Sequence, residues 1–199
     1  IDKVRFAMST EETRYYLNGV HFHPLRQGAT SVLRAVATDG HRLARIETAL
    51  PAGAEALPPI IVPRKAVMEV RKLVEGREEP VRIEVSPSRI RFVVDSSVLT
   101  SRLVDGQFPD YERVIPKEAE RTAIMDSKEF GEAVDGVSTI STERMRAVKF
   151  SFADGQVVLS AVSAEIGRAR KRMAVRYTGE PLEIGFNARY ILDMLNEID

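Results

Sequence analysis

The sequence predicts an α+β protein made of repeated domains in which antiparallel strands pack with helices. Short runs of alternating apolar and polar residues, separated by turn residues, are typical of antiparallel strands. Other stretches place apolar residues at the spacing of an amphipathic helix. Residues 19–22 also match residues 147–150, and residues 61–67 match residues 185–191, at offsets of 128 and 124 residues. A repeat of this length indicates a whole domain rather than a short structural unit.

The first copy of the repeat is expected to open with a helical stretch, because Ile1, Val4 and Ala7 fall on one side of a helix. Since the chain begins within this stretch and without Met, we expect it to be a fragment. Pro63 ends a short apolar strand and is placed to open a helix, which Gly76 ends. The strands of this copy are expected at residues 20–23, 32–37, 43–48, 60–62, 81–85, 90–94 and 98–104.

The second copy has an opening strand and a helix start that the first copy lacks. Asp126 is placed to cap this helix, with Glu129 as its reciprocal partner three residues later. Asp154 and Gly155 supply the tight turn of a hairpin, and Asn187 is placed to cap a further helix. The strands of this copy are expected at residues 121–125, 147–152, 157–163, 168–177 and 182–186.

Composition places the chain among ordinary globular proteins. Its 199 residues are 44% apolar and 29% charged, enough for one large domain or two small ones. The absence of Cys excludes disulfide scaffolds, thiol catalysis and Cys-ligated zinc, and makes a reducing cytoplasm the default location. No window approaches about 18 consecutive apolar residues, so we expect no membrane segment. Basic and acidic residues balance at 29 each, so any nucleic-acid contact must depend on local basic groups.

One group of residues suggests a hydrolase. His21 and His23 are two residues apart on an expected strand and face the same side, and Asp39 and His41 follow one strand away. These four residues are candidates for a metal-dependent phosphodiesterase. The sequence has no carboxylate pair, HExxH helix, GxSxG elbow, Walker loop or GxGxxG motif to accompany them. We therefore expect a solvent-facing strand here, with no catalytic residue, no metal and no cofactor.

Three segments combine residue types that their expected secondary structure does not require. Arg14–Gly19 either buries one Tyr as a hydrophobic staple or exposes an aromatic, cationic loop that can stack on bases and touch phosphate. Thr38–Leu43 is either a solvated hairpin tip or a functional turn, since a tight turn needs Asp and Gly but not the His-Arg that follows them. Phe108–Tyr111 is expected to be a linker pressed on neighbouring strands, which is compatible with a groove beside it.

Five motifs resemble those of the bacterial sliding clamp family, the beta subunit of DNA polymerase III. They are Arg14–Gly19, ATDGHRLA at 37–44, IVPRK at 61–65, LVDGQFPDY at 103–111 and EIGFNARYILDML at 183–195. The resemblance implies three similar domains per complete chain, with two chains closing head to tail into a ring around duplex DNA. Each α+β clamp domain has two helices inside and antiparallel sheets outside. The resemblance assigns residues 1–117 to a middle domain without its first elements, and residues 118–199 to a last domain without its C-terminal strands.

The resemblance implies a non-catalytic processivity subunit of the polymerase holoenzyme, which slides on DNA through loose phosphate contacts. Thr139 and Ile140 are implied to lie on the surface that meets another chain. Glu11 stands where a neutral polar residue can occur in the family, which weakens the DNA-facing corner around Arg14. The implied DNA-facing residues are Arg14, Tyr15, Tyr16, Arg64, Lys65, Arg71 and Lys72, with Lys3, Arg5 and Arg189 as further basic candidates.

The resemblance also implies an outer groove that receives short peptide motifs from replicative and repair polymerases, the clamp loader and other clamp-binding proteins. An apolar pocket would hold the anchor side chain, with arginines at its rim. We expect a homodimeric ring for the parent chain, a monomer for the fragment and a location in the bacterial cytoplasm. A peptide-binding module that never encircles DNA is a further alternative. The groove residues are Leu17, Thr38, Gly40, His41, Arg42, Leu43, Pro109, Arg113, Val114, Asn187 and Tyr190.

Overall fold

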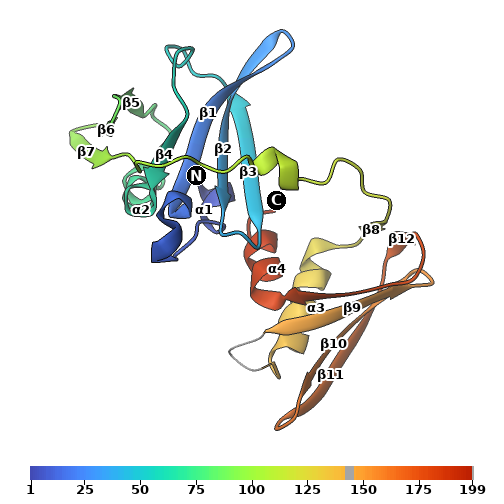
Figure 1. Ribbon diagram of the computed structural model, residues 1–199. Coiled ribbons are helices and arrows are strands. Elements are labelled where there is room, and N and C mark those ends of the chain that lie inside the picture. Colours follow the sequence, from blue (N-terminus) through green and yellow to red (C-terminus); the bar gives the residue numbers. More distant parts are fainter. Residues whose placement is uncertain (142–145, 199) are drawn as a thin grey trace. The chain divides into compact units, whose positions relative to one another are not determined.

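The computed structural model describes residues 1–141 and 146–198. They form two compact units, Ile1–Glu112 and Arg113–Asp199 (Figure 1). Each unit has its own apolar core. Both units combine antiparallel sheets with a few helices, which confirms the predicted α+β class. None of the described helices is long and apolar enough to span a membrane.

The first unit contains two antiparallel sheets. One has the strand order β3-β2-β1-β4 and the other has the order β5-β6-β7. Helix α2 packs against strands of both sheets and so joins them into one core. The elements are α1 (Asp2–Arg5), the 3-10 helix η1 (Glu12–Leu17), β1 (Gly19–Gln27), β2 (Thr30–Thr38), β3 (Leu43–Ala49), β4 (Ile60–Pro63), α2 (Arg64–Val74), β5 (Arg82–Val85), β6 (Arg89–Val94) and β7 (Ser97–Arg102). The 3-10 helix η2 (Tyr111–Val114) follows and contains the division between the two units.

The helix predicted after Pro63 is confirmed, and its start is fixed by a backbone contact. Ala66, Val67 and Val70 are its buried residues, at helical spacing. Pro63 is the extended N-cap residue, so the helix begins at Arg64. No side chain caps this end, but the Arg64 amide donates to the Asn18 carbonyl oxygen at 2.8 Å. The start of α2 is therefore tied to the segment that leads into β1.

The predicted N-terminal helix is shorter than expected. α1 covers only Asp2–Arg5, whereas the apolar spacing predicted a helix through Ala7. The Ala7 amide still donates to the Val4 carbonyl oxygen, which makes a single further turn. Ala7 and Met8 are then buried in the core, and the chain leaves the helical path there.

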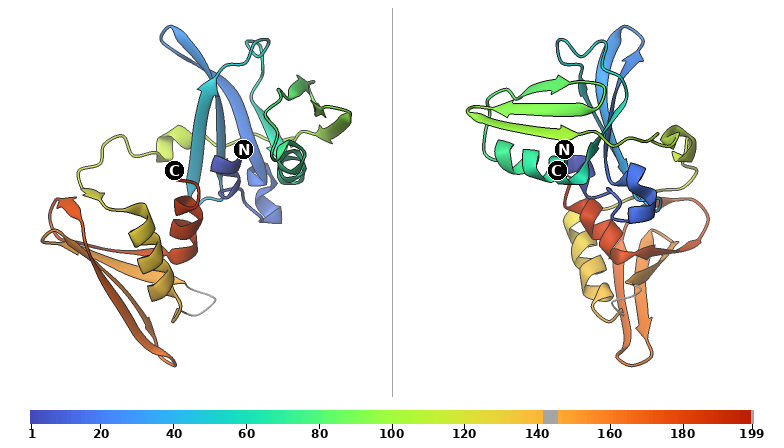
Figure 2. Two further views of the ribbon diagram at one scale, coloured as in Figure 1. Left: turned by 180° about the vertical axis from the view of Figure 1, so that it is seen from behind. Right: turned by 60° about the vertical axis from the view of Figure 1, so that its left-hand side comes forward.

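The second unit repeats the larger sheet of the first. Its sheet has the strand order β11-β10-β9-β13, and β12 pairs with β8 in a separate two-stranded sheet. Figure 2 shows α3 and α4 side by side on one face of the larger sheet, where their apolar residues form the core. The elements are β8 (Thr122–Ile124), α3 (Ser127–Ser138), β9 (Ala147–Ala153), β10 (Gln156–Ser163), β11 (Gly167–Ala174), β12 (Arg176–Thr178), β13 (Leu182–Asn187) and α4 (Ala188–Leu195).

Both predicted helix caps of the second unit are confirmed. An Asp126 carboxylate oxygen accepts from the Glu129 amide at 2.8 Å, and the Asn187 side-chain oxygen accepts from the Arg189 amide at 3.0 Å. Each bond satisfies an amide that has no partner within the first turn of its helix. These local signals were therefore sufficient to locate the start of both helices.

The single strand predicted at residues 168–177 is wrong, because the chain divides there into β11 and β12. Val175 lies between the two strands and is buried in the core. Its amide donates to the Gly155 carbonyl oxygen at 2.9 Å, in the turn of the neighbouring hairpin. This contact turns the chain out of one sheet and into the other, which the alternating pattern did not reveal.

The two larger sheets confirm the repeat found in the sequence. β1 and β9 occupy the same place in the two strand orders, and each sheet passes from its last strand directly into a helix, β4 into α2 and β13 into α4. A finer repeat has no sequence signal. In the described residues, a helix followed by three antiparallel strands occurs three times, starting at α1, α2 and α3.

Candidate functional site

The first unusual segment forms η1, a short 3-10 helix that ends where β1 begins. Leu17 is buried, with 4% of its surface exposed, whereas Tyr15 is 52% exposed. The rings of Tyr15 and Tyr16 meet edge to face, with centroids 5.7 Å apart. Neither Tyr of the segment is buried, so the interpretation as a staple with one buried Tyr is wrong. Leu17 is buried instead, and the Tyr15 ring remains exposed beside Arg14, as the loop interpretation predicts.

Arg14 lies at a break in η1, where its backbone leaves helical geometry. Its Nε donates to one Glu11 carboxylate oxygen at 2.8 Å and its Nη2 to the other at 2.6 Å. The hydrogen bond from Arg14, followed by its positive charge, outweighs burial and lowers the pKa of Glu11 below its ordinary value. Glu11 therefore carries a full negative charge at neutral pH.

The second unusual segment is a fully hydrogen-bonded turn rather than a loose hairpin tip. One Asp39 carboxylate oxygen accepts from the amides of His41 and Arg42 at 2.9 and 3.0 Å, and the other accepts from Arg42 Nε at 3.0 Å. Thr38 Oγ1 donates to the Arg42 carbonyl oxygen at 2.7 Å. Gly40 has φ +89°, which an L side chain rarely adopts. These bonds hold His41 exposed and place the Arg42 guanidinium 5.4 Å from the Phe6 ring centroid.

Two glycines bring η1 against other parts of the predicted site. The Arg14 guanidinium packs directly on Gly40, where a Cβ would meet Arg14 Nη1. Gly106 lies beside Tyr15 and Tyr16, and a Cβ there would be 3.3 Å from the Tyr15 ring. The predicted DNA-facing loop, the predicted groove turn and the approach to the Pro-aromatic segment therefore lie together on the first unit.

The Pro-aromatic segment is pressed on the outer face of β1, as expected. The Phe108 ring stacks on His21 with centroids 4.6 Å apart, and Tyr111 Oη lies 2.9 Å from His23 Nε2. Both Phe108 and Tyr111 are buried. Pro109 remains exposed between them. These contacts fix one of the predicted groove residues against the sheet.

Arg34 completes this attachment and was missed by the sequence analysis. It is buried on β2, with 4% of its side chain exposed, and donates to Tyr111 Oη at 2.7 Å and to a Glu47 carboxylate oxygen at 2.8 Å. Burial alone would lower the pKa of Arg34, but hydrogen bonds to Tyr111, Glu47 and Glu112 hold it above its ordinary value. The available signal was an arginine within the apolar run of an expected central strand.

The histidines lie under the Pro-aromatic segment, which corrects the prediction of a solvent-facing strand. His21 Nδ1 lies 3.1 Å from the Ile60 carbonyl oxygen, and the His21 and His23 rings stack with centroids 5.0 Å apart. Burial, together with the charge of His23, lowers the pKa of His21 to about 4, despite the bond to Ile60. The described residues contain no group of three or more His, Cys, Asp or Glu placed to hold a metal ion. Nothing in this arrangement supports the phosphodiesterase alternative.

The basic residues predicted to face DNA differ in their partners. Arg71 pairs with Asp2 at 2.7 Å, and Lys72 pairs with Glu69 at 3.0 Å. Arg64 and Lys65 are exposed at the start of α2, and the described part of the chain gives neither of them an ion pair. Arg64 and Lys65 are thus the basic groups of this helix that are available to an external anion.

The remaining predicted residues lie in the second unit. Arg113 and Val114 belong to η2, and Asn187 and Tyr190 lie at the start of α4. Their place beside the groove turn of the first unit stays a prediction. Thr139 caps the C-terminus of α3 and is exposed, while Ile140 follows it and packs on the core of the second unit.

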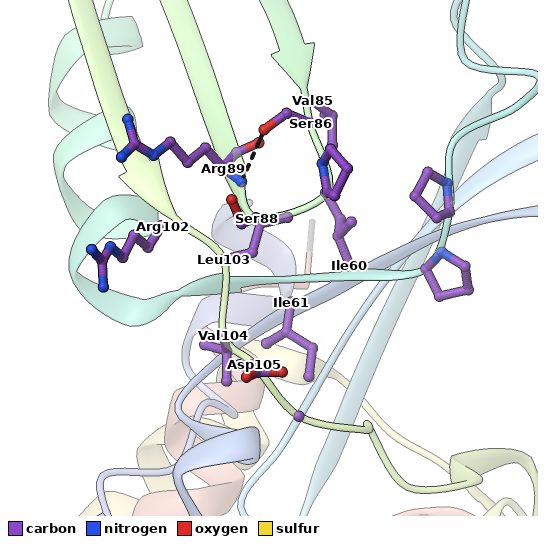
Figure 3. Close-up of a pocket in the computed structure, with 14 residues that line it drawn as sticks. Ile60, Ile61, Val85, Ser86, Ser88, Arg89, Arg102, Leu103, Val104 and Asp105 are labelled. Carbon is purple, nitrogen blue, oxygen red and sulfur yellow. Dashed lines mark hydrogen bonds between the residues drawn. The ribbon is translucent and has the colours of Figure 1, made fainter.

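A cavity of about 860 Å³ lies elsewhere in the first unit, beside β4, the β5–β6 turn and the chain after β7 (Figure 3). None of the predicted groove residues lines it. Arg89 and Arg102 lie opposite each other in the register of β6 and β7, and their side chains extend to the same side. Asp105 is the one carboxylate among the described residues that line the cavity. These residues therefore do not supply the two carboxylates that would act as general acid and general base.

The fold and the site together define a protein of repeated clamp-type domains. Two family models match the chain, the central domain of the DNA polymerase III beta subunit over residues 1–110 and its C-terminal domain over residues 112–199. The chain belongs to this family, that of the bacterial beta sliding clamps.

Named relatives agree with this assignment. The beta sliding clamp of Caulobacter vibrioides is 50% identical over 198 residues, and that of Vibrio cholerae is 42% identical over 199 residues. Both alignments cover 100% of this chain and 53% of the relative, so the chain spans about half the length of these relatives.

Solved structures match over the same extent. A sliding clamp from Bartonella birtlesii bound to griselimycin superposes with a TM-score of 0.96 at 49% identity, covering 100% of this chain and 53% of that one. A clamp from Pseudomonas aeruginosa superposes with a TM-score of 0.91 at 36% identity, covering 100% of this chain and 54% of that one.

Proposed function

We propose that this chain is the middle and last part of a DNA sliding clamp, a ring that encircles duplex DNA and keeps the replicative polymerase on it. The observation that carries the proposal is the match to the Bartonella birtlesii clamp, with a TM-score of 0.96 over the whole chain at 49% identity. We place the middle domain at residues 1–117 and the last domain at residues 118–199. The complete protein would be a non-catalytic processivity subunit in the bacterial cytoplasm.

The DNA-facing surface is proposed to work through weak phosphate contacts. Arg64 and Lys65 support this role because they are exposed and no described carboxylate pairs with them. A ring needs no tight contact, since its closure retains the duplex, and loose contacts allow sliding. Arg71 and Lys72 contribute less in this scheme because each already has a carboxylate partner. Arg14, Tyr15 and Tyr16 would add a further contact, since the Tyr15 ring is exposed.

The peptide groove is proposed to lie on the outer surface of the middle domain. The turn from Thr38 to Leu43 supports this role because its hydrogen bonds hold exposed and half-buried side chains in fixed positions. Buried Phe108 and Tyr111 fix exposed Pro109 in the same way. An apolar anchor of a polymerase, clamp-loader or repair-protein motif would enter here, with Arg113, Val114, Asn187 and Tyr190 completing the groove.

The ring is proposed to be a homodimer of complete chains, with Thr139 and Ile140 near its junction. The fragment would be monomeric, because a closed ring requires each domain to find a neighbour. Sedimentation of the fragment at micromolar concentration tests this directly. A dimer of ring size would contradict the proposal.

The proposed function is tested with the complete parent chain and its loader on plasmid DNA. A clamp remains bound to closed circular DNA at high salt and is lost when a restriction enzyme makes the DNA linear, because a ring slides off a free end. A peptide-binding module that never encircles DNA is retained on neither form. Equal loss from circular and linear DNA would therefore exclude the clamp function.

A further inference from the structure

The Arg14 side chain is already occupied by an anion of its own chain. Its Nε and Nη2 bind the two oxygens of Glu11 at 2.8 and 2.6 Å. This edge of a guanidinium group presents two parallel N–H donors and can bind a phosphate or carboxylate in a bidentate manner. The Nη1 atom on the other side lies against Gly40. A phosphate that takes the Nε/Nη2 edge of Arg14 must therefore displace Glu11.

The position of Glu11 is set by the backbone around it. Its amide donates to Ser9 Oγ at 3.1 Å, and its carbonyl oxygen accepts from Asn18 Nδ2 at 3.0 Å. Ser9 is buried, and its own amide donates to the Leu17 carbonyl oxygen at 3.1 Å. The carboxylate is thus held next to Arg14 by bonds at both ends of the loop. The pair is not an accidental contact between two long side chains.

We propose that Glu11 competes with DNA phosphate for Arg14 and thereby lowers the affinity of this surface for DNA. The inference rests on the proposed function, which places Arg14 on the DNA-facing side. Only the fraction of molecules in which Arg14 has left Glu11 can make the phosphate contact, so the apparent affinity falls in proportion to that fraction. A clamp that must slide benefits from such a contact, because each phosphate is held weakly and exchanged readily.

Removing the charge of Glu11 tests the competition. We expect Glu11→Gln to bind double-stranded DNA about two- to fivefold more tightly, the range that corresponds to an exposed ion pair. Because Arg14 then displaces one more counterion, the slope of log affinity against log salt should become steeper by about 0.9. Fluorescence anisotropy of a labelled duplex, titrated at several salt concentrations, measures both quantities. Circular dichroism and urea midpoints show that each variant folds.

Glu12→Gln is the matched control. Glu12 is the next residue and is exposed, and the described structure gives it no ion pair with Arg14. The Glu12→Gln variant removes the same charge from the same loop, so it reproduces any effect that the change in net charge has by itself. We expect it to leave the salt slope unchanged. Equal changes in the two variants would overturn the proposed competition.

Arg14→Ala separates the competition from the proposed DNA surface. If Arg14 touches DNA, this variant binds less tightly than the parent, and adding Glu11→Gln to it brings no further change in slope. A Glu11→Gln effect that persists without Arg14 would overturn the competition while leaving the DNA surface intact. Unchanged binding by Arg14→Ala alone would instead show that Arg14 is not a DNA contact. This result would reject both the competition by Glu11 and the place of Arg14 on the DNA-facing surface.

Discussion

The outer faces of β1 and β9 occupy equivalent places in the two sheets but have different surroundings. In the first unit, His21 and His23 lie beneath Phe108 and Tyr111. At the equivalent places in the second unit, Lys149 is exposed and pairs with Glu183 at 2.7 Å. Ser151 donates to the same carboxylate at 3.1 Å, and these two contacts lower the pKa of Glu183. Among the described residues, one face is covered by a distant segment and the other is not covered by any.

The strand beside each of these faces differs in the same way. Arg34 pairs with His23 in the register of the first sheet, and Val158 pairs with Ser151 in the second. Arg34 is buried and bonded to the covering segment, whereas Val158 is half-buried and makes no such bond. The repeated sheet is therefore a common frame, and among the described residues the outer face of the first copy has contacts that the second copy does not make.

We expect the largest effect when Arg34 is removed, because the loss of stability should be much greater on the covered face than on the other. Arg34→Ala removes the bonds to Tyr111, Glu47 and Glu112 together and leaves a buried gap, so we expect a loss of about 3–5 kcal/mol in the free energy of unfolding. Lys149→Ala, on the other face, should cost less than about 1 kcal/mol. Urea unfolding followed by circular dichroism measures both. Equal losses would show that the covering segment contributes little to stability.

The two equivalent hairpin turns provide the next test. We expect Leu43→Ala, in the groove turn, to weaken binding of a fluorescent clamp-binding peptide by about 1–3 kcal/mol, because it removes apolar surface from the pocket. Ile166 lies in the corresponding turn between β10 and β11 and is 65% exposed. Ile166→Ala should leave peptide affinity unchanged. A parent-like affinity for Leu43→Ala would show that the groove lies elsewhere.

Stability should depend on pH through the covered face. The pKa of His21 is about 4 when folded and about 6.5 when unfolded, so the unfolded chain binds more protons between these values. The stabilisation is fully present above about pH 6.5 and is lost as the pH falls toward 4. We expect a loss of about 1–2 kcal/mol for this half-buried ring, after allowance for solvent screening. Urea midpoints across this range measure it, and an unchanged pH profile in His21→Asn would refute this origin.

We expect the smallest effect for the basic residues at the starts of α2 and α4, where the quantity compared is the salt dependence of DNA binding. Arg64 and Lys65 have no described ion pair, whereas Arg189 of α4 lies 4.0 Å from Asp193. Replacing Arg64 and Lys65 together by Ala should reduce the salt slope of DNA binding by up to about 1.8, without creating a sequence preference. Arg189→Ala should have a smaller effect on the slope. A salt-insensitive or sequence-specific complex would contradict loose phosphate contact.

The features that could be predicted from sequence are those with local causes. Asp126 and Asn187 cap helices through bonds to residues two or three positions away, so the pattern alone located them. The positions of most strands along the chain were predicted from the alternation of apolar and polar residues and from turn residues. The repeat was predicted from matching segments of the sequence. The motifs of the groove turn and of the Pro-aromatic segment also marked the regions that the structure brings against η1 and β1.

The features that could not be predicted depend on contacts between distant segments. Arg34 and Tyr111 are 77 residues apart in sequence, and no pattern joins them. Val175 interrupts a strand because its amide meets the Gly155 carbonyl oxygen in a different hairpin. The bidentate pair of Glu11 and Arg14 depends on the break in η1 at Arg14. Sequence gives the residue types in these cases, and only folding determines their partners.

Asn18 limits how this part of the molecule can be exchanged with that of a relative. Its carbonyl oxygen accepts from the first amide of α2, while its side chain donates to the Glu11 carbonyl oxygen. A chimaera that receives a foreign η1 loop without an Asn here loses the side-chain bond to the Glu11 carbonyl oxygen, whereas any residue at this position still offers its backbone carbonyl oxygen to α2. Recombination between clamps in this region is therefore expected to keep the loop in place only when the residue at position 18 can still donate to the Glu11 carbonyl oxygen.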